Sequence, residues 1–335
     1  MARYVAAFAA ALVLTSAATA GAQDIAGRVR EVRNGTVRLT FASKPGVCGD
    51  GETFISSRGW SDDGQRRTIF RDSRDSYSIT TGDDNWRGSR DCEEGPVRVA
   101  LEVDNGEVVD VKTYVGKNWR SNEPAMQVSS KAAVDYLFGV IERGNNRAAK
   151  RSFTAIVMAD SVQPAPQFIR IAKSSNVSRE SRKSAIFWAG QTGDARIDRE
   201  IATLIGDNDR EVAKSALFAM SQSKTDESER ALLAAARNQN LSLDVRKSAV
   251  FWIGQMATEA ATKGLKDLMT DENTEVKKQA VFALSQMKTE SSVDALINIA
   301  RTSKDRELRK SAMFWLGQSN DPRALALFEE ILLKN

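Results

Sequence analysis

The sequence contains no histidine. Histidine is the commonest general base, the middle member of the Ser-His-Asp arrangement and a frequent zinc ligand, so its absence excludes every site that depends on it. Motifs for Ser-Lys or paired-carboxylate catalysis are lacking as well. We therefore expect a protein that is not an enzyme and that uses neither a cofactor nor a metal ion.

Long blocks of one charge are also missing. The 48 basic and 44 acidic residues give a net charge of +4 and are interleaved along the chain. This pattern is typical of a solvated surface and not of the basic stripe that binds nucleic acid. We expect a partner other than a nucleic acid.

The chain lacks an apolar stretch of membrane-spanning length. Its N-terminal apolar run, residues 5–14, is about half of what a membrane-spanning helix needs. Arg3 precedes this run and small residues up to Ala22 follow it, which is the pattern of a secretory signal peptide. We expect residues 1–22 to be removed on export, leaving a mature protein without a membrane span in the periplasm or outside the cell.

Cysteine is scarce. The only two cysteines are Cys48 and Cys92, in a chain that we expect to reach an oxidising compartment. An even pair there is typical of one disulfide rather than of two free thiols. We predict a Cys48–Cys92 bond, which stabilises the fold by ~4 kcal/mol through loop-closure entropy.

What the sequence has in abundance is an internal repeat. Eight-residue segments of similar pattern begin at positions 184, 215, 248, 279 and 311, so the offsets are 31, 33, 31 and 32 residues. A degenerate copy begins at Ser152. A shared period of this length is the signature of a repeat architecture.

Each segment is expected to lie in a helix. Acidic or Asn residues suited to cap a helix precede the segments, as at 207–209 and 271–273. A second amphipathic stretch lies between successive segments, as at 230–237 and 293–300. Two helices in each repeat predict an α-solenoid of about six helix pairs that begins near Ala132 and is closed by a lone helix from Arg323 to Lys334.

Two repeats carry a family resemblance. Residues 244–249 (Asp-Val-Arg-Lys-Ser-Ala) and 275–280 (Glu-Val-Lys-Lys-Gln-Ala) are similar to the second helix of HEAT repeats, especially of the short bacterial HEAT-like class. The resemblance covers about residues 131–334, and the Phe-Trp-Leu-Gly-Gln variant looks like that of exported bacterial HEAT proteins of unassigned activity. It implies the fold but not the function, because HEAT repeats serve scaffolds and a few enzymes alike. Some short HEAT-like repeats occur in bilin-attaching lyases, and the expected export argues against that role.

A segment of another kind precedes the repeats. Residues 29–41 alternate apolar and polar side chains around Asn34-Gly35, and residues 97–114 do so around Asp104-Asn-Gly106. Both are hairpin patterns, and residues 66–71 resemble a further strand. The expected fold class is therefore α+β and multidomain. A small disulfide-bonded β domain at 23–122 precedes an all-α HEAT-type solenoid at 123–335.

The middle of the β domain, residues 58–94, is a long polar stretch. Its carboxylates could surround a calcium ion: Asp83, Asp84, Asp91, Glu93 and Glu94. EF-hand spacing is absent, however, and we expect no metal site. Two interpretations of Trp60 and Trp86 stay open, since these side chains either belong to a binding surface or cover the small core.

One face of the repeated helix is expected to be packed. Its column alternates between large and small side chains, which are Trp188, Ala219, Trp252, Ala283 and Trp315. We expect them to interdigitate in the core between layers. Basic residues just before the segments are expected to pair with acidic loop residues of adjacent repeats, and they are Arg182, Arg246, Lys277 and Arg309.

The opposite face repeats three residue types at one-turn spacing. They are Phe187, Phe218, Phe251, Phe282 and Phe314; Lys183, Lys214, Lys247, Lys278 and Lys310; and Gln191, Gln222, Gln255, Gln286 and Gln318. On the inner face of a solenoid these columns would form a groove for an extended protein or peptide segment. The rings add contact area, the amides bond to the backbone, and the lysines attract acidic residues. In the alternative, each Phe packs against the neighbouring repeat and the other two columns are only solvated.

Three functions are compatible with these patterns. The first, which we favour, is a non-catalytic protein-binding scaffold or adaptor in the cell envelope that uses the groove. The second is an enzyme or ligand-binding activity in the β domain, presented by the solenoid. The third is a purely structural envelope protein.

Overall fold

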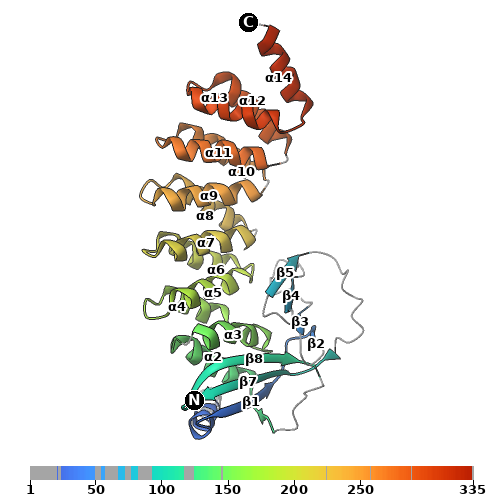
Figure 1. Cartoon of the computed structure of the whole chain (residues 1–335), viewed down its shortest axis with the longest axis vertical. Helices are drawn as coiled ribbons and strands as arrows, with labels where there is room; N and C mark the ends of the chain where they lie inside the picture. The colour runs from blue at the N-terminus through green and yellow to red at the C-terminus, as the bar shows by residue number, and fades with distance from the viewer. Residues whose placement is uncertain are drawn as a thin grey trace, which may run out of the picture. The chain divides into compact units, whose positions relative to one another are not determined.

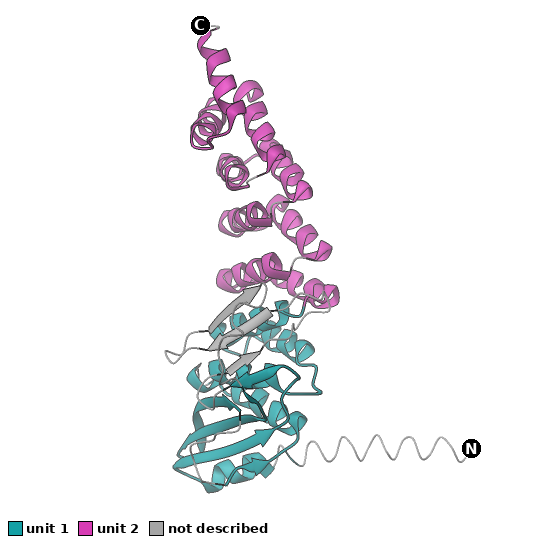
Figure 2. Ribbon diagram, turned by 90° about the vertical axis from the view of Figure 1, so that its right-hand side faces the viewer, with its two compact units in different colours: residues 1–192 teal, residues 193–335 magenta. Residues whose placement is uncertain are grey.

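The computed structural model describes residues 21, 24–49, 54–56, 67–71, 77–81, 93–116, 124–144, 146–223, 225–256, 258–287 and 289–333. The contacts divide the chain into two compact units, unit 1 at residues 1–192 and unit 2 at residues 193–335 (Figure 2). Apart from Gly21, the expected signal peptide lies outside the described residues, so its removal stays a prediction.

Unit 1 contains a four-stranded sheet of order β8-β7-β1-β9 (Figure 1). Its strands are β1 (Gly35–Phe41), β7 (Val97–Asp104), β8 (Glu107–Val115) and β9 (Met126–Gln127). The pairs β1–β7 and β7–β8 are antiparallel, and the short β9 runs parallel to β1. Because side chains alternate along a strand, the buried Val37, Leu39 and Phe41 share one face. This face is the core side of the sheet.

The hairpin predicted around Asp104-Asn-Gly106 is confirmed. Strands β7 and β8 pair up to Asp104 and Glu107, which leaves a two-residue loop. The loop residues Asn105 and Gly106 have φ angles of 52° and 81°. This left-handed conformation at both positions is what a tight hairpin needs.

The hairpin predicted around Asn34-Gly35 is wrong, because residues 24–31 form a helix. Ile25 and Val29 are four residues apart and both are buried, so they lie on one helical face. The side chain of Asn34 instead accepts a hydrogen bond at 3.0 Å from the backbone N–H of Asn105. The Asn-Gly pair therefore leads from a helix into β1 and does not join two strands.

A second, antiparallel sheet in unit 1 has the order β5-β4-β3-β2-β6. Its strands are β2 (Val47–Gly49), β3 (Phe54–Ser56), β4 (Arg67–Arg71), β5 (Tyr77–Thr81) and β6 (Glu93–Glu94). Strand β4 confirms the strand predicted at 66–71. Cys48 is buried on β2, where its register partner is Glu94. Cys92 lies outside the described residues, so the disulfide stays a prediction.

The first repeat helices also belong to unit 1. They are α2 (Ser130–Glu142), α3 (Asn146–Met158), α4 (Ala165–Lys173) and α5 (Arg179–Gly190). Helix α3 packs on β8, and Arg151 donates to both carboxylate oxygens of Asp110 at 2.9 and 2.7 Å. These contacts give the sheet and the first repeats a common core. The compact units consequently divide at Thr192/Gly193, whereas the sequence predicted a boundary at 122/123.

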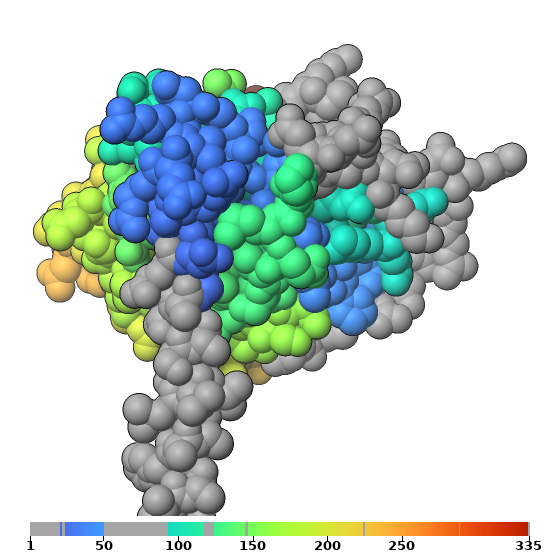
Figure 3. Space-filling model, turned by 90° about the horizontal axis from the view of Figure 1, so that it is seen from below, coloured from blue at the N-terminus to red at the C-terminus, as the bar shows by residue number. Residues whose placement is uncertain are grey.

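The N-terminal helical residues pack beside α2 in unit 1. Figure 3 shows residues 24–49, in blue, next to the green residues of α2 on one face. A Cβ atom at Gly21 would lie 3.0 Å from the Cβ of Ala132 on α2. The described chain therefore begins in direct contact with this helix.

Unit 2 is a stack of helix pairs (Figure 2). Its first helices are α6 (Ala195–Ala202), α8 (Asp226–Arg237), α10 (Glu259–Asp267) and α12 (Glu290–Thr302). Short 3-10 turns, η1 (Thr203–Gly206) and η2 (Leu268–Thr270), extend α6 and α10. Its second helices are α7 (Arg210–Ser223), α9 (Leu243–Met256), α11 (Thr274–Gln286) and α13 (Arg306–Gly317).

The predicted helix count is confirmed for the described residues. Unit 1 holds the pairs α2/α3 and α4/α5, and unit 2 holds four more, which makes six. Helix α14 (Pro322–Leu333) is the predicted lone helix. In unit 2, α9 lies between α7 and α11, and α11 also contacts α13. Successive second helices are therefore neighbours, which places equivalent residues of successive repeats side by side.

Side-chain caps begin the helices at the predicted positions. Asp209 accepts the backbone N–H of Glu211 at 3.0 Å, and Asn273 accepts that of Glu275 at 2.9 Å. Thr225, Thr258 and Thr289 cap the first helices α8, α10 and α12 in the same way. Each such cap contributes ~1 kcal/mol, so the polar turns of the repeat fix where its helices start.

Candidate functional site

The predicted phenylalanine column is present on the second helices. Phe187 lies on α5 in unit 1, and the others lie on α7, α9, α11 and α13 in unit 2. None of the five is buried, and Phe251 and Phe314 expose 37% and 59% of their surface. We call the surface formed by the exposed rings of unit 2 the aromatic face, which consists of Phe218, Phe251, Phe282, Phe314, Trp252 and Trp315.

The rings of the aromatic face form two clusters. In the first, the ring centre of Trp252 lies 5.1 Å from that of Phe218 and 4.9 Å from that of Phe251. In the second, that of Trp315 lies 5.2 Å from Phe282 and 5.0 Å from Phe314. Each tryptophan thus joins the Phe of its own helix to the Phe of the preceding repeat. Pairs at these distances contribute ~0.5–1.5 kcal/mol each beyond simple burial.

The tryptophan column is less buried than predicted. Trp188 is buried, and so are Ala219 and Ala283, which confirms the alternation of large and small side chains. Trp252 and Trp315, in contrast, stay partly exposed, so their assignment to the core is wrong. Each of these two indoles contacts the Phe of the preceding repeat.

Four of the five lysines in the column are paired with carboxylates. Lys183, Lys278 and Lys310 lie 3.3, 3.4 and 3.3 Å from the Glu three residues earlier on the same helix. Lys214 donates at 2.9 Å to Asp244 of the next repeat. This hydrogen bond, aided by the charge of the lysine, lowers the pKa of Asp244, and the charge of the fifth lysine, Lys247, helps to lower it. The column therefore carries acids and bases side by side and is not a free positive stripe.

The glutamine column differs between the two units. Gln191 in unit 1 is buried, with 6% of its surface exposed. Its equivalents in unit 2 are exposed, and they are Gln222, Gln255, Gln286 and Gln318. Gln222 and Gln286 donate to the hydroxyls of Ser221 and Ser285 at 3.3 and 3.2 Å. Unit 2 thus presents a row of amides that remain accessible to a partner.

Two members of the basic column are buried arginines. The Nε of Arg182 donates to the carbonyl oxygen of Ala172 at 2.8 Å, and that of Arg246 donates to Ala236 at 3.0 Å. Both carbonyls belong to the last turn of the preceding first helix, where backbone oxygens lack a helical donor. Arg246 also forms an ion pair with Asp271 of the next repeat.

The other two members are more exposed and also act within the fold. Lys277 lies 3.8 Å from Asp305 of the next repeat. Arg309 donates at 2.7 Å to the carbonyl oxygen of Ser303. The structural role predicted for the basic column is confirmed in both kinds of contact, so these residues do not belong to the candidate binding site.

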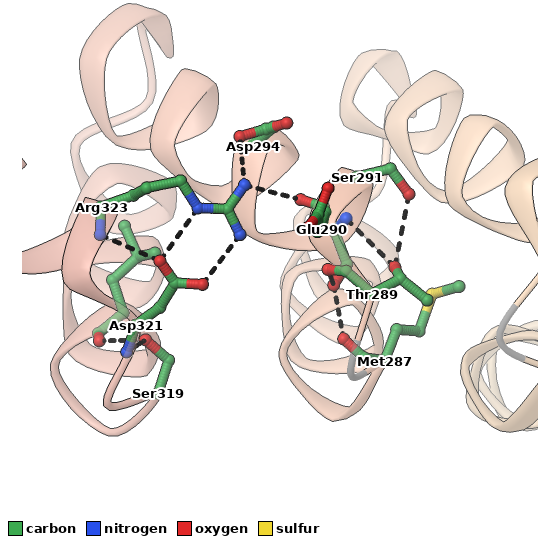
Figure 4. Close-up of polar contacts among 10 residues, drawn as sticks. Met287, Thr289, Glu290, Ser291, Asp294, Ser319, Asp321 and Arg323 are labelled. Atoms are coloured by element: carbon green, nitrogen blue, oxygen red, sulfur yellow. Dashed lines mark hydrogen bonds and ion pairs between the residues drawn. The ribbon is translucent and has the colours of Figure 1, made fainter.

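A polar ladder links the first helices of successive repeats. Figure 4 shows the Arg323 guanidinium between Asp321 and Asp294. It donates to Asp321 at 2.9 and 2.8 Å and to Asp294 of the preceding repeat at 2.9 Å. In the next layer, Ser291 donates to Thr262 at 3.4 Å. These contacts fix the spacing of the repeats.

The sequence interpretation missed two sets of residues at the aromatic face. The first set is Trp252 and Trp315, whose position directly after a Phe was the available signal. The second set is the carboxylates that pair with its lysines: Glu211, Glu275, Glu307 and Asp244. Three of these stand three residues before a lysine on a helix, a spacing that brings side chains together.

The remaining candidate residues of the β domain are not described. The predicted polar stretch lies outside the described residues at Asp83, Asp84, Asp91, Trp60 and Trp86. Within the described part of the chain, no group of three or more His, Cys, Asp or Glu side chains could hold a metal ion. No helix in that part is long and apolar enough to cross a membrane.

The C-terminal repeats of this chain are similar to a known repeat family. HEAT repeats match residues 229–314 and 269–335. Curated proteins give no match. The matched region contains α9 to α14 and most of α8, which includes the second ring cluster and two rings of the first.

Several solved repeat structures are distantly similar. Human deoxyhypusine hydroxylase in complex with glycerol shares 15% identity over 59% of this chain and 77% of its own, with a TM-score of 0.28. A designed armadillo repeat protein in complex with the peptide (KR)4 shares 20% over 57% and 92%, with a TM-score of 0.30. The complex of CpcE and CpcF of phycocyanin lyase from Nostoc sp. PCC7120 shares 13% over 63% and 85%, with a TM-score of 0.29.

Similarities of this size carry no argument about function. The family match is of a different kind, because it rests on the sequence of the repeats themselves. Residues 229–335 of this chain match the HEAT repeat family.

Proposed function

We propose that this protein is a non-catalytic scaffold that binds an extended segment of a partner protein on the aromatic face of unit 2. The observation that carries the proposal is the exposure of large rings at equivalent positions of successive second helices. Phe251 and Phe314 are among the most exposed large apolar side chains of the described residues. Apolar side chains that gather on a surface mark sites of protein–protein interaction.

Packing alone does not account for the aromatic face. A buried Phe would favour the purely structural alternative, because its ring would stabilise the stack and offer nothing to a partner. All four phenylalanines of unit 2 instead keep part of their surface accessible. Exposed Gln222, Gln255, Gln286 and Gln318 add hydrogen-bonding groups for the backbone of a bound segment.

Charge has a smaller part than the lysine column suggests. A partner's acidic residues must compete with the carboxylates that already pair with Lys214, Lys278 and Lys310. Exposed pairs of this kind are worth ~0–1 kcal/mol and weaken with salt. Affinity for an acidic segment is therefore a minor, salt-dependent addition to the contact made by the rings.

The place of action is part of the proposal. The signal-peptide pattern of residues 1–22 supports export to the periplasm or the outside of the cell. A disulfide between Cys48 and Cys92 fits that compartment. A scaffold of the cell envelope is the role that combines these features with the aromatic face.

The proposal is tested by comparing how well two double variants capture the partner. Each variant removes two exposed apolar side chains. Phe251→Ala with Phe314→Ala removes rings from the aromatic face, whereas Leu332→Ala with Leu333→Ala removes similar groups from α14. The leucines expose 76% and 87% of their surface. The first double variant should lose the partners that the unaltered protein and the second double variant retain. Equal capture by all three proteins would contradict the proposed function.

A further inference from the structure

We infer that the aromatic face recognises an extended, uncharged segment with two apolar side chains about six residues apart. This inference rests on the proposed function and specifies the chemistry of the partner. It follows from the arrangement of the rings in two separate clusters, from the distance between these clusters, and from the balance of charge around them.

The two ring clusters are built in the same way. The first combines Phe218 of α7 with Phe251 and Trp252 of α9. The second combines Phe282 of α11 with Phe314 and Trp315 of α13. Corresponding members are two repeats apart, since each cluster spans two second helices. One apolar side chain of a partner can meet the same chemical surroundings at each cluster.

A different junction separates the clusters. Between α9 and α11, the column that alternates between Trp and Ala contributes Ala283. A Cβ atom placed at Gly254 would lie 2.9 Å from the Cβ of Ala283. The two backbones therefore approach closely, and no ring of the first cluster contacts a ring of the second among the described residues of unit 2. The face offers two discrete apolar sites and not one continuous strip.

The spacing of the clusters determines the spacing of the groups that they bind. Packed helices lie 8–10 Å apart, so two layers correspond to ~16–20 Å. An extended chain rises ~3.3 Å per residue, so this distance corresponds to about five to six residues. Six is a multiple of the two-residue period of a β-strand and of the three-residue period of a polyproline II helix. In both conformations, side chains six residues apart therefore point to the same side.

The charges on this face favour an uncharged segment. Lys214 is within 4 Å of both Asp244 and Glu211, while Lys278 and Lys310 each have a glutamate. An acidic peptide therefore meets carboxylates as well as lysines, and nucleic-acid phosphates would meet the same repulsion. Apolar side chains of a partner would face the rings, and its backbone groups would face the glutamine amides. Neither contact is opposed by a charge of the same sign.

The inference is tested with synthetic peptides and the full-length protein. Fluorescent peptides of about 16 residues, built from Gly, Ser and Asn, would carry two Leu residues three, six or nine positions apart, or a single Leu. Their dissociation constants would be measured by fluorescence anisotropy. We expect the six-residue spacing to bind at least ~10-fold tighter than the three-residue spacing or the single Leu, because linking two contacts raises the effective concentration of the second. The three-residue spacing cannot reach both clusters and should bind like the single-Leu peptide, whereas the nine-residue spacing can span them and should keep part of the gain.

Variants connect the spacing effect to the rings. Phe251→Ala or Phe314→Ala should each reduce the binding of the six-residue peptide to the single-Leu level. Leu332→Ala on α14, which removes an even more exposed apolar side chain, should leave it unaltered.

The outcomes separate the inference from the proposed function. Equal binding at all spacings, weakened by the Phe variants, would overturn the two-site inference and leave the scaffold function standing. Tighter binding of an Asp-rich peptide without Leu would also overturn the inference. No peptide binding, together with partner capture that the Phe variants do not change, would overturn both.

Discussion

A Cβ atom placed at Gly254 would lie 2.9 Å from the Cβ of Ala283 in the next repeat and 3.1 Å from its Cα. Gly254 therefore permits the close approach of α9 and α11. Gly254→Ala should lower the free energy of unfolding by ~1–3 kcal/mol through overpacking, despite the better helix propensity of alanine. Denaturant unfolding followed by tryptophan fluorescence measures the change.

Gly317 supplies the control for this substitution. A Cβ atom there meets nothing closer than the Phe328 ring at 3.9 Å. Gly317→Ala should be neutral or stabilising by up to ~1 kcal/mol. If both alanines act alike, the close α9–α11 junction is not what requires the glycine.

Arg246 is expected to be the most sensitive member of the basic column. It is 5% exposed, donates to the carbonyl oxygen of Ala236 and pairs with Asp271, which is also buried from solvent at its side chain. Arg246→Met leaves the carboxylate without its cation, which costs ~3–5 kcal/mol. Arg309→Met, which removes contacts only to backbone carbonyls, should cost ~1 kcal/mol. Similar losses for the two variants in denaturant unfolding would contradict this ranking.

Asp198 on α6 should make the free energy of unfolding of unit 2 depend on pH. Its Oδ2 accepts hydrogen bonds from Ser223 at 2.5 Å and Thr225 at 2.6 Å, while its buried Oδ1 has no partner among the described residues. Burial raises the pKa of Asp198, and the two hydroxyls oppose this effect. Nearby Asp194 and Glu227 raise the pKa further.

The sign of the pH effect follows from this raised pKa. The stability that a raised carboxyl pKa contributes is present below the unfolded value of 3.8 and is lost as the pH rises through the folded pKa. The unfolding free energy of the protein, relative to that of its Asp198→Asn variant, should therefore fall as the pH rises from the unfolded value of 3.8 through the raised folded pKa. Denaturant unfolding at several pH values tests this, and a constant difference would contradict it.

Asp321 provides a carboxyl with the opposite shift. Its hydrogen bonds with Arg323 lower its pKa to about 2. Its contribution is present above the unfolded value of 3.8 and is lost only as the pH falls towards the folded pKa. The Asp321→Asn variant should consequently show no comparable decline in the neutral range.

The Cys48–Cys92 disulfide remains to be measured. Cys48 lies on β2 opposite Glu94, which follows Cys92 by two residues in the sequence. Mass mapping of exported protein without reduction should therefore find a peptide that links the two cysteines. Two alkylated thiols in that preparation would contradict the prediction.

Unit 2 should fold without unit 1. A protein of residues 193–335 retains the four helix pairs, α14 and their internal contacts. Circular dichroism should show a strongly helical spectrum, because each repeat is stabilised mainly by its neighbours. A fragment that starts at 126 would lose β1, β7 and β8, against which α3 packs, and should be less soluble. A disordered 193–335 fragment would contradict the division into units.

The sequence by itself determined the features that a few neighbouring residues encode. The period of the eight-residue segments predicted six helix pairs, and Asp209 and Asn273 predicted where helices begin. The turn at Asn105-Gly106 was predictable for the same reason, since its φ angles depend on those two residues. The recurrence of Lys, Phe and Gln also identified the face to which the rings belong.

Only the tertiary structure decided what depends on contacts between distant residues. Ile25 and Val29 form a helix because their buried partners lie elsewhere in the chain, although their local pattern also suits a strand. Trp252 is partly exposed while Trp188 of the same column is buried, and Gln191 is buried while Gln255 is not. Local periodicity places a side chain on a helix face, but the neighbouring layer decides how much of that side chain reaches solvent.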